Sequence, residues 1–193
     1  AFNTSLSQLT ISNNLGIVTG SITNAIALYN SNVGSLTVST DATTIFGDIA
    51  TLVDVFNSTI SNIEISTDAV ENAGDIYTNL NIANTAATNI ANIVVSTNVG
   101  TNSGNIFTNL NLANTAATSI ANIAVNTNVT TNSGNIYTAL NTANTEATKI
   151  GALTINTRVT TNSGSIATNL SNANTSATTI GSLVISTTVT TNS

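Results

Sequence analysis

Few residues in this chain could perform chemistry, because it contains no histidine and no cysteine. The usual general base, the thiol nucleophile and the common zinc ligands are therefore missing. Seven of the eight acidic residues lie between Asp41 and Asp75. Within that stretch Asp68, Glu71 and Asp75 have a spacing that would place three carboxylates on one helix face, where they could bind Ca²⁺. No calcium-loop motif accompanies them, so we favour a solvated acidic face and predict no metal, no cofactor and no enzymatic activity.

Surface modification is the second kind of chemistry that the sequence offers. Asn-x-Ser/Thr sequons occur at Asn3, Asn57, Asn128, Asn169 and Asn174. Glycans attached there would solubilise a chain with few charges. Such matches also arise by chance in a sequence rich in Asn, Ser and Thr, and both interpretations stay open.

Composition excludes several classes of protein. Only 5% of the residues are charged, the net charge is -6, and Trp, Met, Cys and Pro are absent. We expect no nucleic-acid partner, because phosphate binding needs clustered Lys and Arg. No apolar run is long enough for a membrane span. The chain is also poor in the bulky side chains that fill a compact globular core.

The chain is built from internal repeats, and these determine where the acidic residues and the sequons lie. Related heptapeptides begin at Ser7, Gly34 and Ser61, 27 residues apart, and then at Ala91, Ala121, Gly151 and Gly181, 30 residues apart. We therefore divide the chain into a lead-in (1–6), two 27-residue repeats (7–60), four 30-residue repeats (61–180) and a partial repeat (181–193). Fixed periods of this size are typical of stacked units or periodic rods.

Within a repeat, two periodicities alternate. Val129, Ile136, Ala143 and Ile150 are seven residues apart, which is the heptad spacing of a coiled-coil helix. The next equivalent position, Val159, follows after nine residues, and the intervening segment alternates apolar and polar residues as a strand does. These patterns predict an elongated, mostly α homotrimeric coiled coil, with a short β-layer at each LTI-type segment.

The segment V-x-x-N-x-x-x-I, formed by Val129, Asn132 and Ile136, returns around Asn102 and Asn162. It resembles the I-x-x-N-T-x-x-I repeats of trimeric coiled-coil fibres, which occur in trimeric autotransporter adhesin stalks and in phage or virus tail fibres. The resemblance implies that Asn102, Asn132 and Asn162 face the threefold axis and form layers that hold an anion. It also implies triangular β-layers at the nine-residue steps.

A β-solenoid, or β-helix, with 30-residue coils is the alternative fold. Asn and Thr are poor helix formers, and identical residues 30 apart would stack into side-chain ladders. Two observations favour the coiled coil instead. The apolar residues between Ile76 and Ile90 follow a 4, 3, 4, 3 spacing, and the chain has only 11 glycines for a fold that needs tight corners.

The function predicted from these patterns is structural. We expect an Asn/Thr-rich fibre or stalk segment, extracellular or on a cell or virion surface, that acts as a spacer or filament. It would self-associate as a homotrimer or filament and reach a surface receptor or glycans through a tip. The alternative is a β-solenoid adhesin or ice-binding module that contacts its ligand directly through rows of Thr and Asn.

Overall fold

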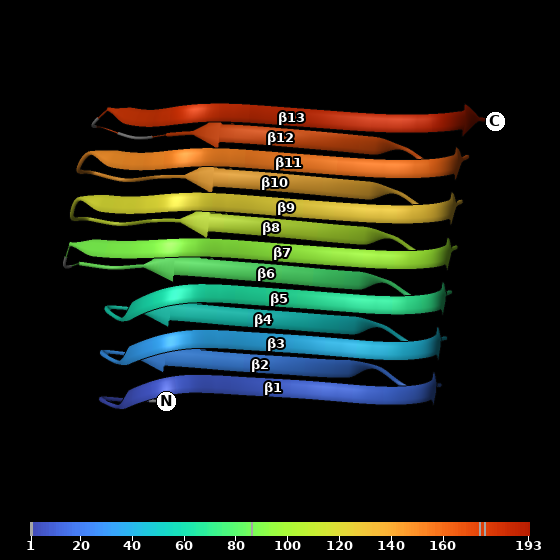
Figure 1. Ribbon diagram of the computed structural model, residues 1–193, viewed down its shortest axis with the longest axis horizontal. Coiled ribbons are helices and arrows are strands. Elements are labelled where there is room, and N and C mark those ends of the chain that lie inside the picture. The colour runs from blue at the N-terminus through green and yellow to red at the C-terminus, as the bar shows by residue number, and fades with distance from the viewer. Residues whose placement is uncertain (1, 86, 174, 176) are drawn as a thin grey trace.

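The computed structural model describes residues 2–85, 87–173, 175 and 177–193. Over these residues the chain forms thirteen β-strands and no helix (Figure 1). Every pairing between strands is parallel, and the chain winds through about six coils. Each coil contributes one long and one short strand. The protein is therefore a two-sheet parallel β-solenoid.

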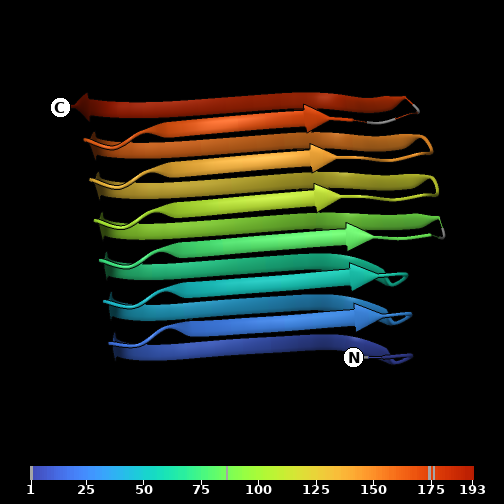
Figure 2. The same ribbon diagram turned by 180° about the vertical axis from the view of Figure 1, so that it is seen from behind.

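The long strands form a seven-stranded sheet, and the short strands form a six-stranded sheet that packs against it and lies nearer the viewer in Figure 2. The long strands are β1 (Ser5–Val18), β3 (Asn32–Ile45), β5 (Thr59–Asn72), β7 (Thr88–Asn102), β9 (Thr118–Asn132), β11 (Thr148–Asn162) and β13 (Thr178–Asn192). The short strands are β2 (Ile22–Tyr29), β4 (Ile49–Phe56), β6 (Ile76–Ala83), β8 (Ile106–Leu112), β10 (Ile136–Thr142) and β12 (Ile166–Asn172).

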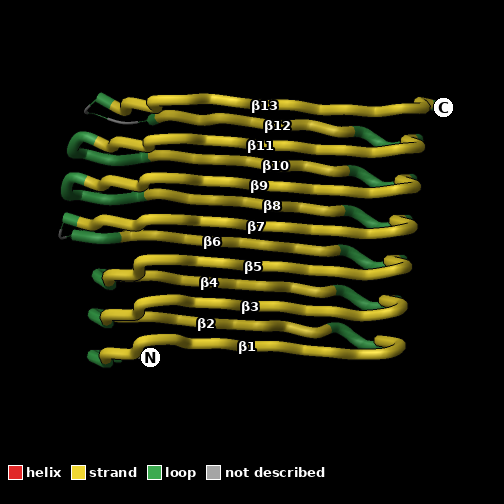
Figure 3. The backbone as a smooth tube through the Cα atoms, in the orientation of Figure 1, coloured by secondary structure: helices red, strands yellow, loops and turns green. Residues whose placement is uncertain are grey.

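The prediction of a mostly α homotrimeric coiled coil is wrong, and so is the fold that the resemblance to trimeric fibres implied. Strands and loops account for the whole described backbone (Figure 3). The reason is visible in β6, where Ile76, Thr78, Leu80 and Ile82 all point into the core. Because Thr78 is polar, the sequence pattern hid a strict two-residue alternation and left a false helical spacing. The alternative, a β-solenoid, describes the structure.

The register of the parallel strands fixes which residues are neighbours. Strands β1, β3 and β5 pair residues that are 27 apart in sequence, whereas β7, β9, β11 and β13 pair residues that are 30 apart. Ile93, Ile123 and Leu153 therefore stack in one row between the sheets, each with at most 1% of its surface exposed. A coil lengthens the protein by one strand spacing, about 4.8 Å, whereas 30 residues of helix would add about 45 Å.

A glycine forms one corner of each coil, between a long strand and the following short one, and in the later coils it belongs to the T-N-S-G motif. A Cβ atom on Gly104 would lie 1.8 Å from the carbonyl oxygen of Gly74, and one on Gly134 would lie 1.6 Å from that of Gly104. The backbones of successive coils approach so closely here that only glycine fits. This requirement is one of space, because neither glycine has a positive φ.

The opposite corner has two forms, which account for the two repeat lengths. In the first coils only residues 30–31 or 57–58 join the strands, and Asn30 and Asn57 adopt a left-handed φ of 48°. Asn tolerates this conformation better than most residues. In the later coils a five-residue loop, such as 113–117, makes the same connection. The three added residues lengthen the repeat from 27 to 30.

We expect the Gly134→Ala variant to lose about 2–4 kcal/mol of unfolding free energy, because overpacking against backbone must shift a neighbouring coil. The matched control is Gly20→Ala. Gly20 forms the same corner in the first coil, where an added Cβ meets nothing within 4 Å. Denaturant titration of both variants checks this expectation, and equal stabilities would contradict the stacked-corner arrangement.

Candidate ligand-contacting surfaces

A buried row of asparagines lines the glycine corner from the inside. Asn102 Nδ2 donates to Asn132 Oδ1 at 2.8 Å and to the carbonyl oxygen of Gly104 at 2.6 Å. Asn132 and Asn162 repeat both bonds. The three residues that the resemblance assigned to axial anion layers thus lie inside a single chain. Both hydrogens of each amide nitrogen are donated to protein acceptors, so this row holds the corner together.

The first member of this row shows what the ladder needs. Asn72 Nδ2 donates to Asn102 Oδ1, but Asn72 Oδ1 is buried without a partner. The residue paired with Asn72 in the preceding coil is Ile45, which is fully buried in an apolar cluster. This inner position of the corner is therefore filled by an apolar residue in one coil and by asparagines in later coils. Where Ile45 is followed by Asn72, the Oδ1 atom of Asn72 is left without a donor.

The outer face of the six-stranded sheet carries a different set of asparagines. Asn111 Nδ2 donates to Asn81 Oδ1 at 2.7 Å, and Asn141 Nδ2 donates to Asn111 Oδ1 at 2.8 Å. A second row lies two residues away, where Asn109 Nδ2 donates to Asn79 Oδ1 at 2.9 Å. We call the surface formed by these five asparagines the amide face. Neighbouring amides lie about 4.8 Å apart along a row, and the rows lie about 7 Å apart along the strands.

A row of aromatic rings borders the amide face. Tyr77 and Phe107 stack with ring centroids 5.1 Å apart, and Tyr137 follows in the next coil. Tyr77 Oη donates to Asp75 Oδ2 at 2.7 Å, while Asp75 Oδ1 accepts from the backbone nitrogen of Asn105 at 2.7 Å. The face is thus bounded on one side by apolar ring edges and an acidic corner.

These contacts shift two pKa values. Partial burial raises the pKa of Asp75, but the hydrogen bonds from Asn105 and Tyr77 outweigh it and hold the pKa below its ordinary value. The hydrogen bond to Asp75 raises the pKa of Tyr77, assisted by burial and by the negative charges of Asp75 and Asp48. The pair is therefore strongest between the two pKa values, where the carboxylate is ionised and the phenol is protonated.

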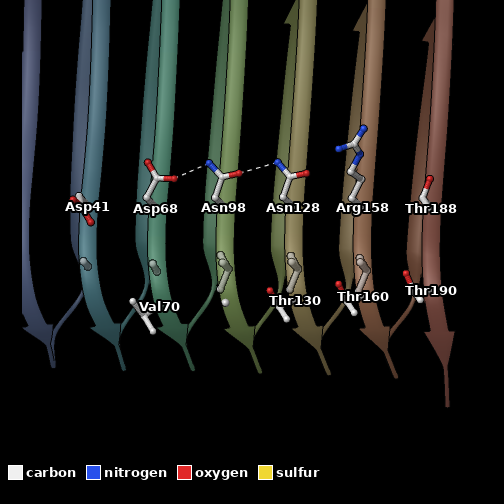
Figure 4. A pocket seen from close by; sticks show the side chains of 16 residues that line it. Asp41, Asp68, Val70, Asn98, Asn128, Thr130, Arg158, Thr160, Thr188 and Thr190 are labelled. Carbon is white, nitrogen blue, oxygen red and sulfur yellow. Dashed lines mark hydrogen bonds between the residues drawn. The ribbon is translucent and has the colours of Figure 1, made fainter.

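The outer face of the seven-stranded sheet carries a groove with a volume of about 590 Å³. It runs across β3, β5, β7, β9, β11 and β13, as Figure 4 shows. One wall is a row with one polar side chain per strand. In strand order these are Asp41, Asp68, Asn98, Asn128, Arg158 and Thr188. We call this row the groove wall.

A shift in the in-out alternation, repeated in each coil, accompanies the groove. In β7 the buried residues Val99 and Asn102 are three apart instead of two, and Val129 and Asn132 repeat this spacing in β9. The Cα pairing skips the residue after the valine on both strands, such as Gly100 in β7. Because this irregularity recurs in register in successive coils, it aligns into one groove with Val99 and Val129 as part of its floor.

Hydrogen bonds connect part of the groove wall along the solenoid axis. Asn98 Nδ2 donates to Asp68 Oδ1 at 2.7 Å, and Asn128 Nδ2 donates to Asn98 Oδ1 at 2.8 Å (Figure 4). Arg158 and Thr188 continue the row and are exposed. The row therefore begins with carboxylates, passes through two amides, and reaches a guanidinium near its other end.

The structure separates the acidic residues singled out in the sequence. Asp68 belongs to the groove wall, Glu71 is exposed further along β5, and Asp75 lies in the corner before β6. Within the described ranges no group of three side chains is placed to hold a metal ion.

The sequons fall on both faces and corners. Asn3 and Asn57 occupy left-handed corners, Asn128 belongs to the groove wall, and Asn169 is exposed on β12. Asn174 lies outside the described residues. Glycosylation of these positions stays a prediction.

Sequence reasoning missed the residues of the amide face, among them Asn81, Asn111 and Asn141. Their recurrence at 30-residue intervals was visible, but without the strand register nothing showed that they point outward in one row.

No protein-family model, curated protein or solved structure matches this chain. The described residues contain no helix with the length and hydropathy needed to cross a membrane. The fold and the side-chain rows therefore carry the functional argument.

We expect Asn132→Ile to lower the unfolding free energy by about 2–5 kcal/mol, because Asn102 loses an acceptor and Asn162 loses a donor in the buried row. Asn122→Ala is the matched control, since Asn122 donates to Asn92 in an exposed outer ladder. Thermal unfolding of both variants provides the measurement. A melting temperature that rises in Asn132→Ile would contradict the ladder.

The Asp75–Tyr77 pair predicts a pH dependence. Its contribution to stability is present above the ordinary Asp pKa and is lost as pH falls through the lowered pKa of Asp75. It is also lost as pH rises through the raised pKa of Tyr77. In a Tyr29→Phe, Tyr137→Phe background only Tyr77 titrates, and we expect Asp75→Asn to shift its ultraviolet ionisation curve to lower pH. An unmoved curve would mean that the hydrogen bond does not form in solution.

Proposed function

We propose that this β-solenoid is an adhesin-type binding module that contacts an extended, hydroxyl-rich ligand through its amide face. It would act outside the cell or on a cell or virion surface. The observation that supports this proposal is the amide face itself, in which Asn79, Asn81, Asn109, Asn111 and Asn141 form two parallel hydrogen-bonded rows. We propose no enzymatic role for it.

The hydrogen bonds between neighbouring asparagines of the amide face hold their side chains in place for a ligand. An amide has two N–H donors and an oxygen with two lone pairs, and a bond along the row uses one donor and one acceptor. One donor and one acceptor per asparagine remain for a ligand. Because the row already fixes the side-chain conformation, a ligand does not have to order it, and preorganisation of this kind improves affinity.

The chemistry around the face selects for an uncharged ligand. Asp54 accepts a hydrogen bond from Asn81 at one end of a row, and Asp48 and Asp75 lie at the neighbouring corner. Both basic residues of the chain, Lys149 and Arg158, belong to β11 of the other sheet. A polyanion would be repelled, whereas alternating hydroxyl groups can donate to and accept from the amides. A neutral linear polysaccharide has this chemistry.

The repeating geometry favours a repeating ligand. Successive coils present the same amide after one strand spacing, about 4.8 Å. A polymer or a layered surface with regularly spaced hydroxyl groups can therefore contact several coils together, and each further contact is intramolecular once the first has formed.

Ice is the other repetitive, hydroxyl-rich ligand to consider. Contact with ice through threonine rows would need Thr side chains on a flat outer surface. The longest Thr rows, such as the one through Thr78, Thr108 and Thr138, are buried between the sheets, each 1% exposed. The outward row formed by Thr101, Thr131, Thr161 and Thr191 lies next to the groove rather than on a flat surface. Ice binding is therefore the less favoured form of the proposal.

A structural spacer remains the second candidate. It is supported by the hydrophobic core, which continues from Leu36 to Ile155 through successive coils. As a spacer, the protein would be a short, stiff block, because its length grows by only about 4.8 Å per coil.

Binding to neutral polysaccharides tests the proposal. We would measure co-sedimentation with cellulose, chitin and an insoluble β-glucan for the wild type and for an Asn81→Ala, Asn111→Ala, Asn141→Ala triple variant. Loss of three hydrogen bonds of about 0.5–1.5 kcal/mol each should weaken binding at least about tenfold. The Asn122→Ala, Asn92→Ala double variant, which removes an outer ladder from the other sheet, should bind normally.

Two results would contradict the proposal. One is no binding to any neutral polysaccharide, and the other is equal binding by the triple variant. Ice shaping that disappears in the triple variant would assign the same face to ice.

A further inference from the structure

The charges of this protein are segregated along the solenoid axis. Seven acidic residues and no basic residue occur up to Asp75, whereas the rest of the chain contains only Glu146, Lys149 and Arg158 as charged residues. Since the chain winds through the coils in sequence order, β1 to β5 belong to the acidic end. Both basic residues lie on β11, near the opposite end. The molecule therefore has an electrostatic polarity along its axis.

The same change of charge along the axis is found in the groove wall. Counted from β3, its six members are two carboxylates, two amides, a guanidinium and a hydroxyl. The row is complementary to a second copy of itself in reversed order. In that arrangement Asp68 of one copy lies opposite Arg158 of the other. Asn98 then lies opposite Asn128, and Asp41 lies opposite Thr188. Each pair joins an acceptor to a group that can donate to it.

We propose that two copies of this chain associate face to face through their seven-stranded sheets, related by a twofold axis that runs parallel to the strands between β7 and β9. This rotation keeps the strand direction and reverses the strand order. The groove walls of the two copies then lie opposite each other with Asp68 facing Arg158 of the second copy. Twofold symmetry forms that ion pair twice, as an isologous interface requires.

The rest of the sheet is compatible with this arrangement. The same rotation places Ser66 opposite Asn156 and Glu64 opposite Thr154, so no like charges meet in these rows. A twofold axis along the solenoid axis would instead stack the acidic ends of both copies, including Asp41 and Asp68, and would be repulsive. Charge complementarity therefore selects one orientation.

The surface has the area that a stable pair needs, and its rows are straight. Six strands spaced at about 4.8 Å, with about ten residues at about 3.3 Å each, give a face of roughly 900 Å² per copy. Standard protein interfaces bury about 800 Å² per partner. The long strands run nearly parallel throughout the sheet with little accumulated twist, so opposed rows stay aligned (Figure 1).

The proposed pair does not depend on the proposed ligand. The amide face belongs to the other sheet, so association through the seven-stranded sheets leaves one amide face exposed on each side of the dimer. If the polysaccharide proposal also holds, the dimer is bivalent. Dimerisation and polysaccharide binding are measured separately, so either proposal can fail while the other holds.

Charge exchange tests the interface. We would measure the mass of the intact chain by analytical ultracentrifugation at low and high salt, for the wild type, Asp68→Arg, Arg158→Asp and the double variant. We expect a wild-type dimer whose dissociation constant rises with salt. Either single reversal should weaken dimerisation at least about tenfold, because two attractive pairs become repulsive. The double variant should recover to within about threefold, because the exchanged charges meet again.

The control is Asp54→Arg, which makes the same change of charge on the six-stranded sheet and should leave the dimer intact. A circular dichroism spectrum identical to that of the wild type would show that each variant is folded. The proposal is overturned by a monomeric wild type at about 100 μM, by single reversals that have no effect, or by a double variant that stays dissociated. Open-ended assembly that grows with concentration would also overturn it, because it would indicate association through strand edges.

Discussion

The structure depends on one constraint, the in-register parallel hydrogen bonding between residues one coil apart. Once Ile93 pairs with Ile123, every other residue of the repeat also meets its own equivalent. The consequences differ with position. Between the sheets, apolar rows form a continuous core, while at the corner glycine carbonyl groups approach so closely that a side chain is excluded. In the polar rows, asparagines bond to asparagines, which satisfies groups that would otherwise be costly to bury.

Much of this arrangement was encoded visibly in the sequence, yet the fold was predicted wrongly. The 27- and 30-residue periods and the poor helix propensity of Asn and Thr both agreed with a solenoid. The error arose from buried threonines such as Thr78 and Thr108, which interrupted the apolar alternation and left Ile76 and Leu80 at a helical spacing. Glycine was also misjudged, because one glycine per coil is sufficient when Asn30, Asn57 or a longer loop forms the other corner.

The surfaces were harder to predict than the core, because they depend on which side chains point outward. At the groove the in-out alternation shifts between Val99 and Asn102, and no property of Gly100 or Val99 alone reveals that shift. Buried and exposed asparagines also look identical in sequence. Asn132 holds a corner inside the chain, whereas Asn111 belongs to an outer face. The two sheets thus present different surfaces. One carries amide rows beside an acidic corner, and the other carries a groove wall that runs from carboxylates to a guanidinium.

The central claim is that residues 30 apart in sequence lie side by side in one chain, and disulfide trapping tests it most directly. The chain has no cysteine, so Asn81→Cys and Asn111→Cys introduce a single possible pair on adjacent strands of the six-stranded sheet, away from the proposed dimer interface. Neighbouring strands are about 4.8 Å apart, within the range of Cα separations that a disulfide spans. The solenoid predicts an intramolecular disulfide in the monomer after mild oxidation, detected by mass spectrometry of its peptides. Free thiols, or disulfides only between chains, would contradict it.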